Sequence, residues 1–461
     1  MGDRPIPGVL RRVSGAAASI LLLLFSLTAG GQERTGAPVA DVFQVMELAA
    51  DGRMNTLWPA FETSDIPILV FDGIDTYLFH FRTIPEGFAR SLRDPEVLIY
   101  HGQHPQARGN SIIRLGETLV ATSVLSSSSK RTGERYALKD MAGIIVHEQF
   151  HVFQRTRHPQ WRQNDGLLLR YPAETAESLL QRRMEKEAFK RAVVAEERAE
   201  IAGWARLALR CREGRLAGLE PPFVLYEKEL QRTEGLSDYV ERVSRGLDPL
   251  NASEMTKGIA PAGVRDLGYV EGRWTAMILD KLYPGWKALL EGDDRLYLEE
   301  ILRTALKESP GQTNAFRPEE AEKMDEAARS DFAEWQRRKK DEIKAYAHEP
   351  GFHIEIDASN APLVLRLFEP LEMEILDDGG VYHRFVFAAG HEGGSLRIMD
   401  HPCLTWFNDS FRVIRLSVNG LKQAPEIIDG EKKLVVKEDG LTIELKYARV
   451  SLDNNLYRCI L

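Results

Sequence analysis

The chain has 461 residues, of which 43% are apolar and 28% are charged, and its formal net charge is −9. This is the composition of a globular protein that is long enough for two or three domains, each with its own core. The acidic balance, and the lack of any basic cluster with interleaved aromatic residues, argue against nucleic acid or an anionic membrane surface as the main partner.

The first residues of the chain have the pattern of an export signal. Arg11 and Arg12 precede an apolar stretch over residues 16–29, and small residues follow it. The pattern predicts a signal peptide over residues 1–31 and an exported protein, either periplasmic or secreted. An apolar stretch of about 14 residues is too short to span a bilayer comfortably, so no membrane contact is expected beyond the export signal. An uncleaved membrane anchor is the alternative interpretation.

Short apolar runs predict β-strands in the part of the chain that follows. The runs lie at residues 66–71, 97–100, 111–114 and 118–122. They have the length and flanking turn residues that are typical of strands. We therefore expect a small N-terminal β-sheet.

The segment 144–154 reads IIVHEQFHVFQ and predicts a buried helix. His147 and His151 are four residues apart, so on a helix they share one face and can bind one Zn²⁺. Glu148 then lies beside the metal, where a glutamate acts as the general base that takes a proton from the attacking water. The alternative is a buried helix whose histidines have only protein partners.

A zinc site of this kind needs a third protein ligand and one open position. A third histidine nearby would require the extended form HExxHxxGxxH, but the chain has Gln154 and Arg157 at the positions of its glycine and last histidine, and His158 is one residue out of register. No histidine occurs over residues 159–347. Within the helical part of the chain, the third ligand is therefore expected to be a carboxylate.

Helical patterns dominate the middle of the chain. They cover residues 173–217, 226–244, 269–282, 297–306 and 318–347. The many charged residues over 181–215 are interpreted as the solvated faces of long helices.

Residues 234–239 read Glu-Gly-Leu-Ser-Asp-Tyr, and together with HEQFH they resemble the gluzincins. These zinc metallopeptidases include thermolysin and many aminopeptidases, and their third ligand lies on a second helix in an E-G-L-[AS]-x-Y or E-x-x-S-D pattern. The resemblance implies that Glu234 is the third ligand and that Asp238 is a second-shell residue, hydrogen-bonded to the outer nitrogen of a ligating histidine. It covers about residues 110–290 and does not assign a subfamily.

The spacing departs from the thermolysin-like pattern, because 82 residues separate His151 from Glu234. Glu174 and Glu177 lie closer and are the competing candidates for the third ligand. Neither has an aspartate four residues later, so Glu234 is preferred.

The resemblance also implies two features that no specific sequence motif marks. Gluzincins present an edge strand before the HExxH helix, against which an extended peptide lies, and the segment 117–124 is in the right order for this role. They use a downstream tyrosine or histidine to donate a hydrogen bond to the developing oxyanion. Tyr269 is the candidate, with an aromatic residue packed at a helix start as the alternative; Tyr239 is a weaker candidate.

The pattern changes at Pro350 and Gly351, after which alternating runs at residues 352–356, 364–368 and 441–445 predict strands. Turn signals separate them at Asp378-Gly379, Asn419-Gly420 and Asp439-Gly440. Cys403 and Cys459 both fall in this region and are able to pair in an oxidising compartment, whereas Cys211 lies in a charged helical stretch and is expected to be unpaired. Whether the first two pair is left open.

The sequence as a whole predicts an α+β protein. Its expected parts are a mainly helical zincin-like domain with a small N-terminal sheet (residues 36–349) and an all-β, sandwich-like domain (residues 350–461). The expected function is an exported zinc metallopeptidase that binds Zn²⁺ and acts on a peptide or protein substrate. The alternatives are a metallohydrolase with another substrate and a non-catalytic binding protein with a vestigial zinc site.

Overall fold

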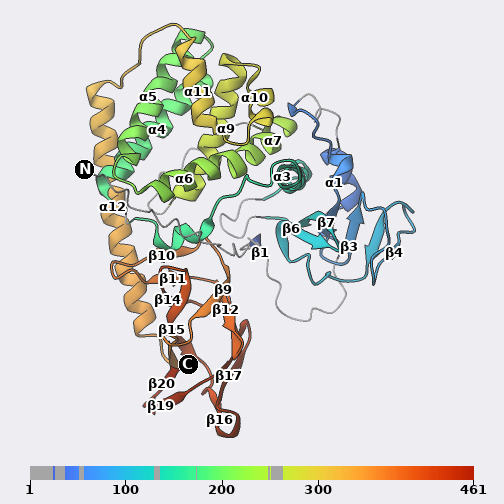
Figure 1. Ribbon diagram of the computed structural model, residues 1–461, viewed down its shortest axis with the longest axis vertical. Helices are drawn as coiled ribbons and strands as arrows, with labels where there is room; N and C mark the ends of the chain where they lie inside the picture. Colours follow the sequence, from blue (N-terminus) through green and yellow to red (C-terminus); the bar gives the residue numbers. More distant parts are fainter. Residues whose placement is uncertain are drawn as a thin grey trace, which may run out of the picture.

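The computed structural model of the chain describes residues 24–25, 37–50, 57–128, 135–172, 174–247, 250 and 263–461. It is a mixed helix-and-sheet protein in three parts: an N-terminal sheet, a helical region and a C-terminal all-β region (Figure 1). The expected signal peptide lies outside the described residues, except for Leu24–Phe25, which form the short strand β1. Within the described part of the chain, no helix combines the length and the apolar character needed to cross a bilayer.

The N-terminal sheet has seven strands in the order β1-β6-β7-β2-β3-β5-β4. Beside β1 these are β2 (Ile68–Phe71), β3 (Thr76–Phe79), β4 (Ala89–Arg90), β5 (Leu98–Tyr100), β6 (Gly109–Leu115) and β7 (Thr118–Val124). The strands β2 and β7 are parallel, and all the other neighbours are antiparallel. The four strands expected from the apolar runs are confirmed as β2, β5, β6 and β7.

Successive residues of these strands face opposite sides of the sheet. On β2, Ile68 and Val70 face the large core that the sheet shares with α1 (Val42–Ala49) and α3 (Leu138–Arg157), whereas Leu69 faces a smaller core on the other side. A short 3₁₀ turn, Thr63–Asp65, leads into β2.

The segment expected to be an edge strand, residues 117–124, is instead an inner strand. It is β7, which lies between β6 and β2 and has four consecutive buried residues from Val120 to Ser123. A strand that is buried on both faces belongs inside a sheet. The strand next to the edge is β6, and the described residues of its outer neighbour β1 pair with Gly109 and Asn110.

The helical region follows α3 and the 3₁₀ segment Asp165–Arg170. Its helices are α4 (Ala176–Val194), α5 (Arg198–Leu216), α6 (Pro221–Leu230), a π-helical turn (Gln231–Gly235), α7 (Leu236–Arg245), α9 (Val264–Leu282), α10 (Trp286–Gly292), α11 (Leu298–Lys307) and α12 (Pro318–Ala347). The stretch 173–217, expected to be helical throughout, breaks into α4 and α5 at residues 195–197. The predicted bounds of α12 are confirmed.

The charged residues of α4 and α5 are not all solvated, which corrects the sequence interpretation. Arg212 and Arg215 are buried and pair with Glu185 of the neighbouring helix at 2.5 and 2.8 Å. Arg212 also pairs with Glu271 of α9 at 2.5 Å, and Arg215 with Glu227 of α6 at 2.8 Å. Buried charges are tolerated where they are paired in this way, and the network joins the four helices α4, α5, α6 and α9.

The C-terminal region contains thirteen strands in one hydrogen-bonded sheet. They are β8 (Phe352–Asp357), β9 (Leu363–Phe368), β10 (Met373–Ile375), β11 (Val381–His383), β12 (Val386–His391), β13 (Gly394–Met399), β14 (Cys403–Phe407), β15 (Arg412–Leu421), β16 (Glu426–Ile428), β17 (Lys433–Glu438), β18 (Leu441–Lys446), β19 (Arg449–Asp453) and β20 (Leu456–Ile460). The expected strands are confirmed as β8, β9 and β18. Gly379, Gly420 and Gly440 all have positive φ, as their turns require.

The two layers expected of a sandwich are joined by the long strand β15. It pairs with β14 and also with two further strands in succession, β9 at Arg412 and Val413 and β8 from Arg415 onward. A strand that changes partners in this way links sheet layers at a corner, so the layers form one continuous sheet. Cys403 and Cys459 lie buried on β14 and β20 and are free, as is Cys211.

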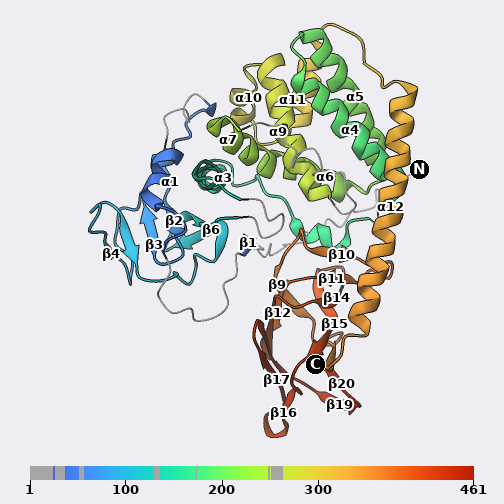
Figure 2. The same cartoon turned by 180° about the vertical axis from the view of Figure 1, so that it is seen from behind.

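The β region is held against the helical region by α12, which runs along both (Figures 1 and 2). Trp335 donates a hydrogen bond to Glu374 at 3.2 Å, and the hydroxyl of Tyr346 donates to the carbonyl of Ser417 at 2.8 Å. Leu169 and Tyr226 of the helical region also share one hydrophobic core with the β strands. These contacts fix the face of the β region that borders the candidate site.

Candidate functional site

The helix α3 presents HEQFH at the bottom of a cleft. At its start, Asp140 accepts a hydrogen bond from the backbone N–H of Ala137 at 2.8 Å and so closes the first turn. Ile145 and Phe150 are fully buried in the core beside α1 and the sheet. With that side of the helix packed, helical periodicity turns His147 and His151 together toward the helical region.

The structure brings His147, His151 and Glu234 together. The Nε2 atoms of the two histidines are 3.1 Å apart, and Oε2 of Glu234 lies 3.1 Å from Nε2 of His151 and 3.6 Å from Nε2 of His147. Donors that surround one tetrahedral zinc at ordinary bond lengths are about 3.3 Å from one another. The spacing of these three atoms therefore fits one tetrahedral metal ion with a fourth position left for another ligand.

The remaining polar atoms of the three side chains have protein partners. Nδ1 of His147 lies 3.0 Å from Oε2 of Glu241, and Nδ1 of His151 lies 3.1 Å from the side-chain oxygen of Gln154 and 3.1 Å from the hydroxyl of Ser237. A carboxylate and an amide oxygen only accept hydrogen bonds, so both histidines carry the proton on Nδ1. Nε2 of each histidine, which faces Oε2 of Glu234, is then the atom that would bind a metal ion.

The other oxygen of Glu234 is occupied as well. Oε1 accepts hydrogen bonds from Gln163 at 2.8 Å and from Arg265 at 3.0 Å. Burial raises the pKa of Glu234, but His151 and Arg265 outweigh that effect and hold the pKa well below its ordinary value. The side chain is therefore a fixed carboxylate with one oxygen, Oε2, directed at the two histidines.

The role expected for Asp238 falls to Glu241 instead. Asp238 is ion-paired with Arg242 at 3.1 Å and with Arg273 of α9. On an ideal helix, a residue seven positions after Glu234 lies about 20° short of two full turns around the helix axis, whereas a residue four positions after it lies about 40° past one turn. Glu241 therefore returns close to the side of Glu234 and faces α3, while Asp238 turns toward α9.

Glycines let the helices that carry these groups approach closely. A Cβ on Gly272 of α9 would lie only 2.7 Å from Cα of Gly235, the residue after Glu234. A Cβ on Gly143 of α3 would lie 3.1 Å from Cγ of Glu241. Glu234 itself lies in the π-helical turn, an irregularity that is frequent at functional sites. The glycine of EGLSDY, together with Gly268 and Gly272, thus allows the helices to pack closely where a side chain would clash.

Glu148 and Tyr269 lie beside the cluster. Glu148 is 5% exposed and lines the cavity, and among the described residues it has neither a hydrogen bond nor an ion pair. Burial raises the pKa of Glu148 above its ordinary value, against the opposing effect of the two histidines. The ring of Tyr269 stacks on His147, with centroids 6.2 Å apart and an interplanar angle of 10°.

The two competing ligand candidates, and His158, which the sequence had already excluded, lie away from the site. Glu174 pairs with Arg182, and Glu177 accepts a hydrogen bond from Gln181. His158 stacks on Trp161 and pairs with an aspartate of the loop before α11. The residues that the sequence interpretation missed are Glu241, Gln154, Ser237, Gln163 and Arg265. Of these, only Glu241 could have been predicted from the sequence, because seven residues are about two helical turns and place Glu241 on the same side of the helix as Glu234.

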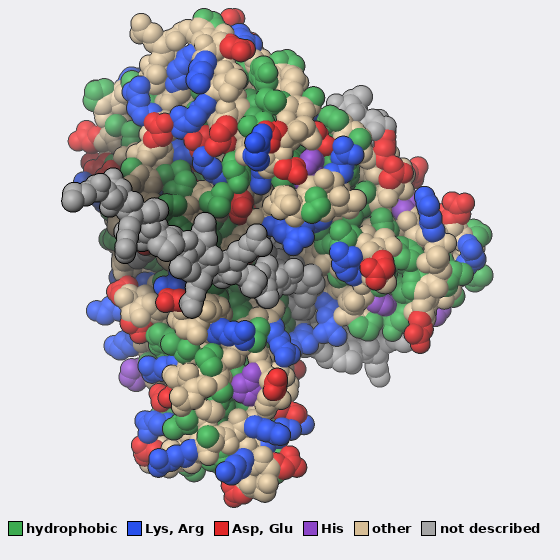
Figure 3. All heavy atoms as spheres, in the orientation of Figure 1, with side chains coloured by type: hydrophobic (Ala, Val, Ile, Leu, Met, Phe, Trp, Pro, Cys, Tyr) green, Lys and Arg blue, Asp and Glu red, His purple; other side chains and the backbone are tan. Residues whose placement is uncertain are grey.

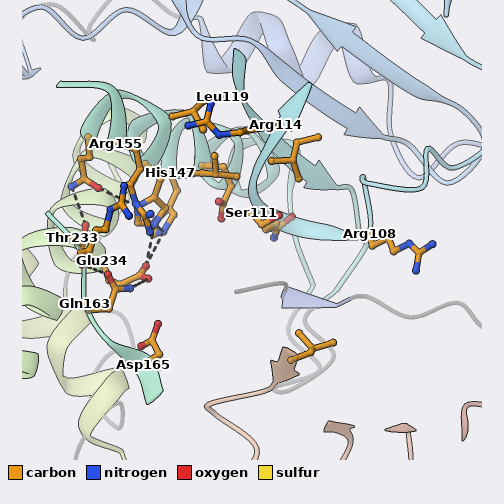
Figure 4. Close-up of a pocket in the computed structure, with 18 of the residues that line it drawn as sticks. Arg108, Ser111, Arg114, Leu119, His147, Arg155, Gln163, Asp165, Thr233 and Glu234 are labelled. Carbon is orange, nitrogen blue, oxygen red and sulfur yellow. Dashed lines mark hydrogen bonds and ion pairs between the residues drawn. The ribbon is translucent and has the colours of Figure 1, made fainter. Parts of the chain in front are cut away.

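The cluster lies in a cavity of about 890 Å³. Figure 4 shows His147 and Glu234 facing each other, with Ser111 and Arg114 of β6 on the opposite wall. The C-terminal region also contributes to the lining, through Leu367 and Arg397. The cavity is therefore bounded by all three parts of the molecule.

Comparison with known proteins adds no further information about the chain. No family model matches it, and no match was found among the curated proteins or among the solved structures. What the site can do is therefore argued from its own geometry.

Proposed function

We propose that this chain is an exported zinc-dependent metallopeptidase with a zincin-like catalytic region. The observation that carries the proposal is the arrangement of His147, His151 and Glu234, whose donor atoms lie 3.1 to 3.6 Å apart with their outer atoms held by other side chains. Supported donors at this spacing are what a metal ion with an open position requires. The proposal that the protein is exported rests on the N-terminal sequence pattern alone.

The chemistry divides between the metal and the protein. Zinc bound here supplies a Lewis acid that lowers the pKa of water and polarises the substrate carbonyl. Glu148 accepts the proton of the attacking water and passes it to the leaving amine, a role that suits a carboxylate with a raised pKa and with no hydrogen-bond partner among the described residues. The ring of Tyr269 lies against His147 and its hydroxyl is 3.4 Å from Arg265, which supports a role for Tyr269 as the donor of a hydrogen bond to the oxyanion.

A peptide is favoured as the substrate because β6 lines the cavity. Its residues Ser111 to Arg114 border the space above the cluster, and within the described part of the chain its outer edge is paired with β1 at Gly109 and Asn110 alone. An extended peptide can pair with a strand whose edge is open. Such pairing aligns a main-chain carbonyl with a fixed site regardless of most side chains.

The first experiment measures metal in purified protein. We expect about one zinc per chain, and we expect the His147→Ala protein to lose it. Glu148→Gln protein is the matched variant, because it keeps all three donors. It is expected to retain zinc and to lose hydrolysis of an unstructured protein such as casein. Zinc retention by His147→Ala would overturn the ligand assignment, and full activity of Glu148→Gln would remove Glu148 as the base.

Substrate class is tested with matched compounds. A fluorogenic peptide and the corresponding simple ester are offered to the zinc-loaded protein. Cleavage of the peptide that is abolished by a chelator and restored by zinc supports the proposal. Cleavage of esters alone, or of neither compound by a zinc-loaded protein, would contradict it.

A further inference from the structure

Arginine side chains dominate the lining of the cavity, in a protein whose net charge is −9. Six of them border it: Arg108, Arg114, Arg155, Arg162, Arg265 and Arg397. Of the described acidic residues, three do so: Glu148, Asp165 and Glu234. On the face drawn in Figure 3, blue side chains gather where the N-terminal and C-terminal parts meet. The charge of the cleft is thus opposite in sign to that of the whole protein.

The acidic residues of the cleft do not neutralise most of these arginines. Arg265 alone pairs with both Asp165 and Glu234. Among the described residues, no carboxylate lies within ion-pair distance of Arg108, Arg155 or Arg162. Arg114 donates a hydrogen bond to the backbone carbonyl of Glu117 at 3.1 Å, and no ion pair joins it to a carboxylate of the described residues. Positive charge therefore remains available to a ligand in the cavity.

Two pairs of these arginines lie close enough to repel each other. Burial, and then the neighbouring Arg162, lower the pKa of Arg155. Burial, and then Arg108, lower the pKa of Arg397. Arg155 and Arg162 line the same cavity, where like charges destabilise each other, and an anion bound between them would relieve this repulsion. Arg397 lies on β13 of the C-terminal region, so this region supplies part of the charge.

Arg155 lies beside the proposed reaction centre, whereas Arg108 lies at the far side of the cavity (Figure 4). Arg155 is four residues after His151, so it is one turn further along the same face of α3. In the view of Figure 4, Arg155 and Arg108 lie on opposite sides of His147. An extended peptide advances about 3.3 Å per residue, so side chains a few residues from the cleaved bond fall within reach of a guanidinium.

We propose that the cleft selects peptides that carry carboxylate side chains near the cleaved bond. This inference rests on the proposed function, of which it names the substrate class. Guanidinium groups bind carboxylates with two parallel hydrogen bonds, and the acidic surface outside the cleft repels such peptides from other sites.

The test separates binding from hydrolysis by using the inactive Glu148→Gln protein. Fluorescent peptides of about ten residues with three glutamates, three glutamines or three lysines at the same positions are titrated, and anisotropy gives each Kd. We expect the glutamate peptide to bind about tenfold more tightly than the glutamine peptide at low salt, with the preference shrinking as salt rises. Amidated copies show whether a terminal carboxylate is responsible instead.

Two arginines that are not fully buried, the exposed Arg108 and the half-buried Arg155, are then replaced together by glutamine in the Glu148→Gln protein. The preference for glutamate is expected to fall to about twofold, whereas the matched control Arg329→Gln on the exposed side of α12 keeps it. Equal affinity for the three peptides, a preference unchanged by the double replacement, or one that disappears on amidation would overturn the inference. If the glutamate peptide is bound selectively but the zinc-loaded parent protein cleaves no peptide, the proposed function is refuted and the inference about peptide binding stands.

Discussion

Replacing Glu241 with glutamine tests the support of the metal site. Nδ1 of His147 lies 3.0 Å from Oε2 of Glu241, and the two side chains are 11% and 17% exposed. Glutamine has nearly the same shape and still offers an oxygen to this N–H, but it carries no charge. The change therefore removes the charge assistance of one hydrogen bond and leaves the donors of the site in place.

The expected magnitude follows from that burial. Loss of an outer partner of a metal-bound histidine lowers metal affinity about 10- to 100-fold. Because water screens this pair little, we expect a value in the middle of that range, about 30-fold, which is about 2 kcal/mol.

The assay is competition for zinc between the metal-free protein and a chromogenic chelator at neutral pH. Asp238→Asn on the same helix is the matched control, because Asp238 pairs with Arg242 and Arg273 instead of a histidine. We expect Asp238→Asn to lower the free energy of unfolding while the zinc Kd stays within about threefold of the parent. The reasoning is refuted if Asp238→Asn weakens zinc binding and Glu241→Gln does not.

Three further predictions follow from other contacts. Gly272→Ala is expected to destabilise the protein by about 1–3 kcal/mol in a urea titration, since its Cβ would meet backbone atoms at Gly235; a silent change would show that the helices separate freely. Tyr269→Phe is expected to lower kcat about 100-fold with zinc content and KM kept, and a change in KM alone would contradict its role at the oxyanion. Burial lowers the pKa of His383 to about 3 in the folded protein, below the ordinary value of about 6.5 that it has in the unfolded chain. As the pH falls below about 6.5, the unfolded chain therefore binds a proton at His383 that the folded protein does not. The free energy of unfolding falls as a result. Between pH 7 and pH 5 this loss is about 2 kcal/mol, and His383→Leu should abolish it in denaturant titrations at the two pH values.

Much of the local structure can be read from the sequence. The spacing of His147 and His151 predicts a shared helix face, and both lie on one face of α3. Gly379, Gly420 and Gly440 mark turns whose positive φ angles a glycine adopts without strain. The preference for Glu234 over Glu174 and Glu177 also agrees with the structure, since Glu234 alone lies against both histidines. These features depend on residues that are near in sequence or on a short motif.

Tertiary packing decided the rest. Whether Asp238 or Glu241 reaches His147 depends on the direction in which α3 and α9 flank α7, and whether Arg212 is solvated or buried depends on helices far away in the chain. The inner position of β7 and the entry of Arg397 into the cleft likewise require the whole assembly of sheet, helices and β region. Helix and strand periods follow from local backbone geometry and determine which side of an element a residue occupies. They leave open which distant element covers that side, because that is settled by the packing of all the elements together.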